Sequence, residues 1–177
     1  MTFGRTNFKP AQQGQLDGFC GVYSLLNFFC RHRNCEPESE DGKKIFRRLL
    51  VLLDRQGKLT VERICTGFRE GQLQKAFNVL AGELHVPYKA WRLASVAGKR
   101  NVQDILELIA GLHVGEAAMV HMDECDHWVL AHSGSAKEFW IDDSSEEVKP
   151  CRARAPMIRE RAMALDTGLV FLNAQTH

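Results

Sequence analysis

The sequence predicts an α+β fold in which helices come first and an antiparallel sheet follows. Apolar residues recur at helical spacing through most of the first half of the chain, whereas the second half carries short apolar runs that are typical of strands. Helices and strands that are segregated along a chain favour α+β over the alternating α/β class. The 177 residues contain no repeat or credible linker, which predicts one domain over residues 1–177.

The helical half opens on a segment that is nearly all apolar. Asp17 and Gly18 predict a turn, and a helix is expected from Cys20 to His32. Its apolar residues cover much of the circumference, so we expect a central buried helix that packs on several sides. These residues are Val22, Leu25, Leu26, Phe28 and Phe29.

Further helices are expected between this segment and residue 84. One follows the acidic loop 36–42, with Asp41 as its cap and Gly57 just past its end. Residues 60–84 predict two short helices that are broken near the two inner glycines. The N-terminal part of the fold is therefore predicted to be helical.

The rest of the chain supplies the predicted sheet. A strand is expected over 86–94, and a helix follows with Asn101 as its cap and Gly111 at its end. The central helix would pack on a C-terminal antiparallel sheet formed by the strands 117–122, 127–132, 138–143 and 168–173.

A hairpin is predicted around the Ser133–Ser135 turn. If it is centred between the second and third turn residues, His127 lies opposite Asp142. Directly opposed residues project from the same face of a sheet, with Cβ atoms about 4.5–5.5 Å apart. Asp142 would then hold one imidazole nitrogen of His127, whereas Asp143 would point to the opposite face unless a bulge shifts the register.

Cys20 stands where a thiol can be activated for nucleophilic attack. The aligned dipoles and unpaired N–H groups of a helix N-terminus lower the pKa of a thiol, and a neighbouring imidazole lowers it further. His127 is the predicted imidazole, with Asp142 setting its tautomer and orientation. A cysteine, a histidine and an aspartate in these roles predict a catalytic triad.

A thiolate that attacks a carbonyl also needs hydrogen-bond donors for the developing oxyanion. The backbone N–H of Cys20 is one predicted donor. The side-chain amide of Gln15, shortly upstream, is the expected second, with Gln13 and Gln12 as alternatives.

These residues, in their order, resemble the papain-like cysteine peptidase superfamily. The matching segments are Gln15, the stretch DGFCG at 17–21 opening a buried helix, His127-Trp128 on a strand and Asp142 on the next strand. An acid in the third place resembles bacterial Cys-His-Asp branches, such as the double-glycine leader peptidases and effector proteases or deamidases. The spacing from Gln15 to Cys20 is shorter by one than in papain and closer to that of Josephin-type deubiquitinases.

The resemblance implies a papain-like fold and a hydrolase that cleaves an amide through a thioester acyl-enzyme. Peptidase activity on a protein or peptide substrate is the first expectation. A glutamine deamidase, a deubiquitinase-like isopeptidase and an acyltransferase are alternatives, because all pass through the same intermediate. A catalytically silent binding module on the same fold is an alternative of a different class.

Composition and charge exclude several other classes. Lys+Arg 23 against Asp+Glu 22 leaves a net charge of +1, so neither a nucleic acid nor a membrane surface is an expected partner. The N-terminus carries no secretory signal, which favours a cytoplasmic protein or a translocated bacterial enzyme. The basic segment 149–161 could dock an acidic partner, although a solvated loop is its default interpretation.

The six cysteines are predicted to be reduced, because disulfide frameworks belong mainly to small secreted chains. Two groups of side chains could offer metal ligands, but neither has the paired spacing of a zinc site. No metal and no cofactor are therefore expected. The two groups are Cys30, His32 and Cys35, and His113, His121, Cys125 and His127.

Overall fold

A computed structural model of the chain describes residues 9–11, 18–97, 102–122, 127–135, 138–142, 151–154 and 168–175. In these residues a six-stranded sheet has the order β1-β6-β2-β3-β4-β5, and each neighbouring pair is antiparallel. Its strands are β1 (Tyr88–Arg92), β2 (Ala117–Met122), β3 (His127–Ser135), β4 (Glu138–Asp142), β5 (Cys151–Arg154) and β6 (Gly168–Asn173).

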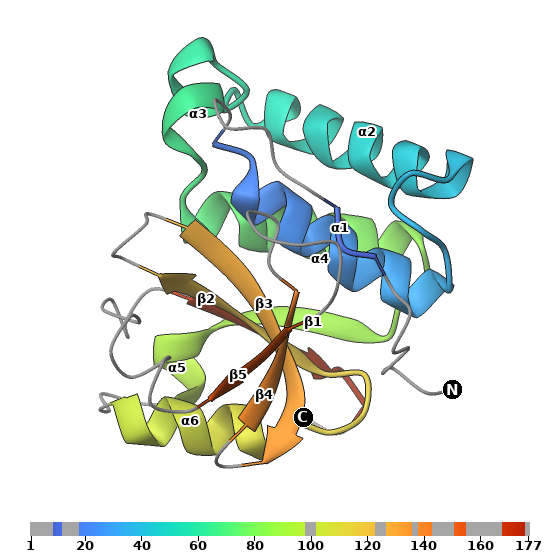
Figure 1. The fold of residues 1–177 in the computed structure, drawn as a ribbon. Helices are drawn as coiled ribbons and strands as arrows, with labels where there is room; N and C mark the ends of the chain where they lie inside the picture. The colour runs from blue at the N-terminus through green and yellow to red at the C-terminus, as the bar shows by residue number, and fades with distance from the viewer. Residues whose placement is uncertain are drawn as a thin grey trace.

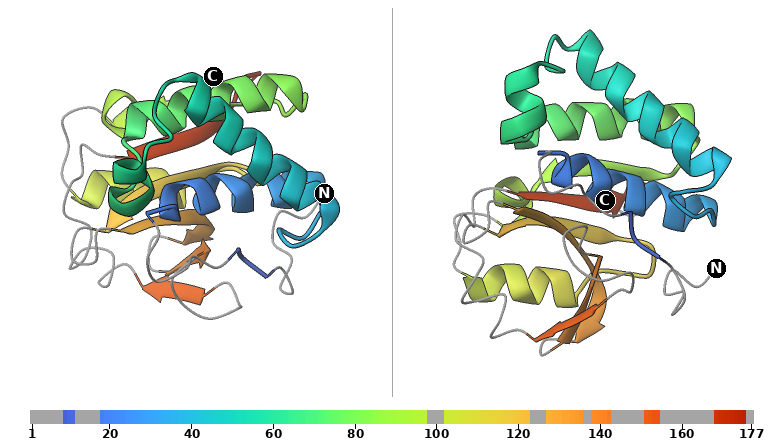
Figure 2. Two further views of the ribbon diagram at one scale, coloured as in Figure 1. Left: turned by 90° about the horizontal axis from the view of Figure 1, so that it is seen from above. Right: turned by 45° about the horizontal axis from the view of Figure 1, so that its top comes forward.

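Helices cover both faces of this sheet (Figures 1 and 2). One side carries α1 (Cys20–Arg33), α2 (Glu40–Arg55), α3 (Val61–Thr66) and α4 (Glu70–Glu83), and the other carries α5 (Leu93–Ala97) and α6 (Val102–Ala110). The predicted α+β class is confirmed. No helix in the described ranges is both long enough and apolar enough to cross a membrane.

Two apolar clusters fill the space between the sheet and its helices. Leu130 and Phe171 belong to the cluster under α1, whereas their strand neighbours Val129 and Val170 belong to the cluster on the α6 side. Successive side chains of a strand point to opposite faces, so β2, β3 and β6 contribute to both clusters in turn. The same alternation determines on which face of the sheet the side chains of β3 and β4 lie.

The helix α1 is the buried central helix that the sequence predicts. Its side chains Val22, Leu25 and Phe28 are fully excluded from solvent. The Phe28 ring contacts Phe77 of α4 and Phe171 of β6, with centroids 5.1 and 4.7 Å apart. Aromatic contacts at these distances add to the burial of apolar area, so α1 is fixed between the helical layer and the sheet.

The other predicted helices are also present, with one correction. The cap of α2 is Ser39 and not Asp41: its Oγ accepts a hydrogen bond of 3.1 Å from the Gly42 N–H. Asp41 is the second residue of the helix, in its first turn, and pairs with Lys44. The predicted break within 60–84 is confirmed, because α3 ends before Gly67 and α4 begins at Glu70.

Two elements differ from the sequence-based expectation. The strand expected over 86–94 ends at Arg92, and the short helix α5 follows directly. This strand, β1, pairs with β6 at one edge of the sheet, so the sheet is not built from the C-terminal half alone. β5 was not expected, because its sequence CRAR lacks the apolar alternation that identifies a strand.

The predicted hairpin register is wrong. Asp142 pairs with Leu130, and not with His127, which instead lies opposite Met122 of β2. Strand β3 runs on to Ser135, beyond the turn that the sequence suggested, and its register with β4 shifts between His132 and Gly134. The observed pairing of Ser135 with Glu138 centres the hairpin two residues later than the predicted turn, and this displacement separates Asp142 from His127. The bulge changes the register by a single residue.

His32, on the last turn of α1, packs inside the protein as a neutral side chain. Its Nε2–H donates a hydrogen bond of 2.9 Å to the Gly115 carbonyl, and its ring contacts those of Phe28 and Tyr88. Burial lowers the pKa of His32 to about 4, although the bond with Gly115 acts in the opposite direction. His32 is therefore a partly buried packing residue that is neutral near pH 7.

We predict that this histidine makes the protein sensitive to acid. Below its ordinary pKa of 6.5 the unfolded chain binds a proton that the folded chain accepts only near pH 4, so the free energy of unfolding should fall across that interval. The loss should be about 3 kcal/mol, and His32→Gln should remove most of it. Urea unfolding at several pH values measures this, with His85→Gln as the control for removing an exposed histidine. An unchanged pH slope in His32→Gln would contradict the account.

Candidate active site

Cys20 is the first residue of α1, and its side chain is 4% exposed. The first hydrogen bond of the helix runs from the Tyr23 N–H to the Phe19 carbonyl, at 2.8 Å. The N–H groups of Cys20, Gly21 and Val22 precede it and have no acceptor within the helix. Phe19 provides no side-chain cap, and the first turn carries no acidic residue. The positive end of the helix is thus presented at the cysteine.

Glycines fix the chain as it enters α1. The Gly18 N–H donates a hydrogen bond of 2.5 Å to the Ile64 carbonyl of α3. A Cβ atom on Gly18 would collide with the backbone of Gly67, and one on Gly21 would meet Leu73 and Trp128. The start of α1 can therefore lie this close to α3, α4 and β3 only because these positions lack side chains.

The N-terminal end of α1 lies beside the start of β3 (Figures 1 and 2). The Ser24 Oγ donates a hydrogen bond of 3.2 Å to the Trp128 carbonyl. Cys20 is one helical turn from Ser24 on the same side, and His127 immediately precedes Trp128.

A polar stripe, formed by Cys20, Ser24, Asn27 and Arg31, follows one side of the otherwise apolar α1. Spacings of four, three and four residues keep these positions within about 60° of one another on a helix. Asn27 Oδ1 accepts a hydrogen bond of 2.8 Å from the Ala11 N–H, and Arg31 reaches β4. The stripe therefore ties α1 to Ala11, β3 and β4, and His32, outside the stripe, adds the bond to Gly115.

A cleft of about 970 Å³ opens at the start of α1. Cys20, His121 and Trp128 contribute to its lining, and the ring centroids of His121 and Trp128 lie 4.8 Å apart. His127 is not among the described residues that line the cleft. It is 6% exposed and, by alternation along β3, it shares the sheet face of Val129. The structure thus brings Cys20 together with His121, while His127 lies at the same end of β3 on the opposite face.

Asp142 is the centre of a buried ionic cluster with Arg31 and His132. Arg31 binds its two carboxylate oxygens through Nε and Nη2, both at 2.5 Å, and His132 Nε2 lies 3.4 Å from Oδ1. The Arg31 and Asp142 side chains are 2% and 0% exposed. Burial raises the pKa of Asp142, but the hydrogen bonds and charges of His132 and Arg31 outweigh it and lower the pKa. Asp142 is therefore an ionised carboxylate that joins α1 to β4.

Several predicted residues lie outside the described residues. These are the proposed oxyanion residue Gln15 and its alternatives Gln13 and Gln12, the alternative acid Asp143, and Cys125. Of the basic segment 149–161, only β5 is described. The described side chains contain no group of three or more His, Cys, Asp or Glu that could hold a metal ion.

Sequence reasoning missed the partners of Asp142. Arg31 stands in the last turn of α1, where a basic residue is ordinary, and His132 continues an alternating strand. A signal for Arg31 did exist, since its spacing from Cys20 and Ser24 places it on their side of an otherwise apolar helix. No comparable pattern in the sequence distinguished His121 from the other histidines.

Comparison with solved structures reveals two related folds. The peptidase domain of Streptococcus ComA, a bifunctional ABC transporter involved in quorum sensing, is 14% identical over 93% of this chain and 98% of its own, with a TM-score of 0.54. A double-glycine motif protease from an AMS/PCAT transporter, solved with a leader peptide, is 12% identical over 94% of both chains, with a TM-score of 0.48.

No protein-family model matches the sequence, and a search of curated proteins also finds no match. At this level of identity the likeness to the ComA domain concerns the fold, which it covers almost end to end. The predicted papain-like fold, with helices packed on an antiparallel sheet, is confirmed.

We predict that the buried ion pair contributes strongly to stability only while both partners are present. Arg31→Met leaves the Asp142 charge buried beside His132 alone and should lower the free energy of unfolding by about 3–5 kcal/mol. The double variant Arg31→Met with Asp142→Leu should recover most of this loss, because an apolar pair replaces the charges. Urea unfolding followed by circular dichroism measures both variants. A double variant no more stable than Arg31→Met would show that the pair does not act as a unit.

Proposed function

We propose that this protein is a cysteine hydrolase that cleaves an amide bond, most simply as a peptidase. The observation that carries the proposal is the position of Cys20: it begins an uncapped, buried helix and lines a cleft beside the start of β3. The fold supports the proposal, because the ComA domain with the same architecture is a peptidase domain. The order of cysteine, histidine and aspartate in the sequence supports it independently.

In the proposed reaction the Cys20 thiolate attacks the carbonyl carbon of the amide. The N–H of Cys20, which has no acceptor within the helix, donates to the resulting oxyanion, with Gln15 as the proposed second donor. The C–N bond then breaks, the amine leaves with a proton from the protonated base, and a thioester remains on Cys20. Water gives a proton to the base and attacks the thioester, which releases a carboxylic acid and restores the thiolate beside the protonated base.

We propose His127 as the base, which requires its ring to reach Cys20 around the first position of β3, since regular alternation places the side chain on the opposite face of the sheet. Its place at the first position of β3, next to the Trp128 carbonyl that Ser24 binds, supports this assignment. The order Cys20, His127 and a following acid also matches that of papain-like peptidases. His121 is the second candidate, because its side chain lines the cleft together with Cys20.

An acid at the end of β4 is the proposed third member of the triad. Asp142 is ionised and rigidly held, but its oxygens are engaged by Arg31 and His132. The register that ranked Asp142 ahead of Asp143 is wrong, so the argument that preferred Asp142 no longer applies. We retain Asp142 as the proposed residue and Asp143 as its alternative.

The proposal predicts turnover that depends on Cys20. A peptide library from a digested cell lysate, incubated with the protein, should yield new peptide termini that mass spectrometry detects. Cys20→Ala should abolish them, because the thiol forms the acyl-enzyme, while circular dichroism shows an unchanged fold. Products that persist with Cys20→Ala would contradict the nucleophile. Conversion of glutamine to glutamate without cleavage would replace the peptidase with a deamidase.

The assignment of the base predicts a difference between two histidine variants. The ultraviolet absorbance of the Cys20 thiolate, taken as the difference from a matched Cys20→Ala protein, should appear at higher pH in His127→Ala than in the wild type. His121→Ala is the matched control and should change this titration little. The reverse order would assign the base to His121 and contradict our assignment.

A further inference from the structure

The cleft that contains Cys20 is lined by an unusual concentration of positive charge. Five of the described lining residues are basic and a single one is acidic. The whole chain carries a net charge of only +1, so this concentration is local. The basic residues are Lys58, Arg63, Arg69, Lys75 and Arg92, and the acidic one is Glu70.

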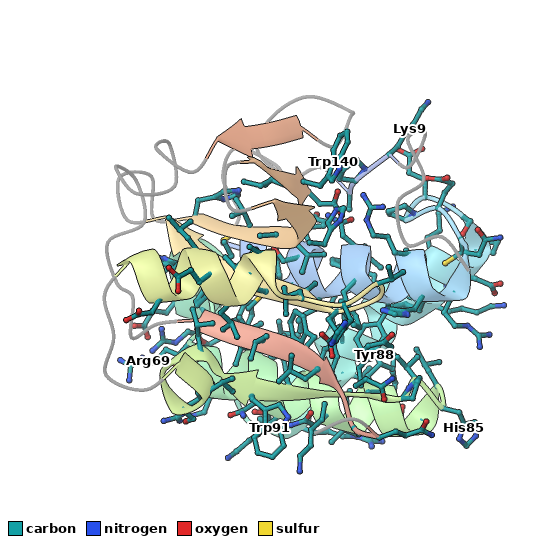
Figure 3. All side chains as sticks on the ribbon, turned by 90° about the horizontal axis from the view of Figure 1, so that it is seen from below. Lys9, Arg69, His85, Tyr88, Trp91 and Trp140 are labelled. Carbon is teal, nitrogen blue, oxygen red and sulfur yellow. The ribbon has the colours of Figure 1, made fainter. Side chains whose placement is uncertain are left out.

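Four of these cations, Lys58, Arg63, Arg69 and Lys75, form one wall of the cleft, which runs from the segment after α2 through α3 into α4. Arg92 lies at the end of β1, and Cys20, His121 and Trp128 come from α1, β2 and β3. Arg69 lies at the outer edge of the molecule, where α4 begins (Figure 3). A bound polymer could therefore contact this basic wall while one of its bonds lies at Cys20.

The charges on this wall are not neutralised within the described structure. Glu70 lies 3.9 Å from Arg92, with its Oε1 near Nε, and its side chain is 15% exposed. Among the described residues, Lys58, Arg69 and Lys75 make no ion pair with an acidic side chain, and all three are exposed. Like charges that line a concave surface reinforce one another, and they attract an anionic ligand more strongly than isolated surface charges do.

An acidic polypeptide fits this surface better than a nucleic acid does. Proteins that bind single-stranded nucleic acid present exposed aromatic rings on which bases stack. The aromatic side chains among the described lining residues are Phe68 and Trp128, which are 4% and 5% exposed. The near-neutral net charge also differs from the basic character of nucleic-acid-binding domains.

We propose that the substrate is an acidic polypeptide segment, whose carboxylates bind the wall formed by Lys58, Arg63, Arg69 and Lys75. This inference rests on the proposed function, which places the scissile amide at Cys20. The acidic residues would lie on the side of that amide that extends along α3 and α4. Specificity would then come from charge along this wall rather than from a pocket for one side chain.

Binding by the catalytically inactive Cys20→Ala protein tests this proposal without requiring turnover. The probes are a short fluorescein-labelled peptide rich in glutamate and the same peptide with glutamine in place of each glutamate. Fluorescence anisotropy should show that the glutamate peptide binds at least about tenfold more tightly at low salt. Because the contacts are electrostatic and exposed, high salt should remove most of this difference.

Variants locate the binding surface. Lys58→Glu with Lys75→Glu should weaken binding of the glutamate peptide by about tenfold or more, and the milder change of both residues to Gln should weaken it less. Lys44→Glu with Arg47→Glu is the matched control, because it changes the net charge equally at exposed positions of α2 outside the cleft lining. Thermal unfolding of each variant confirms that the fold is retained.

Three results would overturn the proposal. In the first, the glutamate and glutamine peptides bind equally. In the second, the control variant Lys44→Glu with Arg47→Glu weakens binding as much as Lys58→Glu with Lys75→Glu does. In the third, an oligothymidylate binds more tightly than the glutamate peptide, and Lys58→Glu with Lys75→Glu abolishes its binding. The last result would assign the surface to a nucleic acid. If the acidic peptide binds but no Cys20-dependent turnover is found, the proposed hydrolase activity is contradicted, whereas the proposal that the cleft binds an acidic polypeptide still holds.

Discussion

The contact between α1 and the sheet is the constraint on which the rest of the structure depends. Its apolar part buries Phe28 and its neighbours, but apolar packing alone would let the helix slide. Two polar ties fix the position: Ser24 holds β3 through the Trp128 carbonyl, and Arg31 holds β4 through Asp142, two turns further along. Burying Arg31 and Asp142 costs solvation energy, and the bidentate geometry offsets that cost only in one arrangement. The pair therefore favours a single placement of α1.

That placement positions Cys20 beside the start of β3. The same stripe that carries Ser24 and Arg31 begins at Cys20, so the ties that position the helix also position the thiol. Cys20, at the N-terminus of α1 beside the start of β3, then lines the same cleft as the basic side chains. The ComA peptidase domain shares the fold at 14% identity, which shows how little of the sequence the fold requires.

Much of the fold could be predicted from the sequence because it rests on local patterns. Helical spacing of apolar residues gave α1, α2 and the pair α3 and α4, and apolar runs gave β2, β3, β4 and β6. The register of β3 with β4 could not be predicted, because β3 continues to pair through Ser133–Ser135, whose composition is typical of a turn, so the hairpin is centred two residues later. For the same reason the sequence placed Asp142 beside His127 and missed Arg31. Cys20 was found because its position at a helix start is itself a local feature.

The most direct test of the central claim is the rate of iodoacetamide labelling as a function of pH, resolved for each cysteine by mass spectrometry. Cys30, fully buried, and Cys65, exposed, provide internal references for an inaccessible and an accessible thiol. The account predicts that Cys20 reacts fastest and still reacts well below pH 7. A Cys20 that is inert, or that reacts only near the ordinary thiol pKa of about 8.5, would contradict it and leave Cys20 as a packing residue.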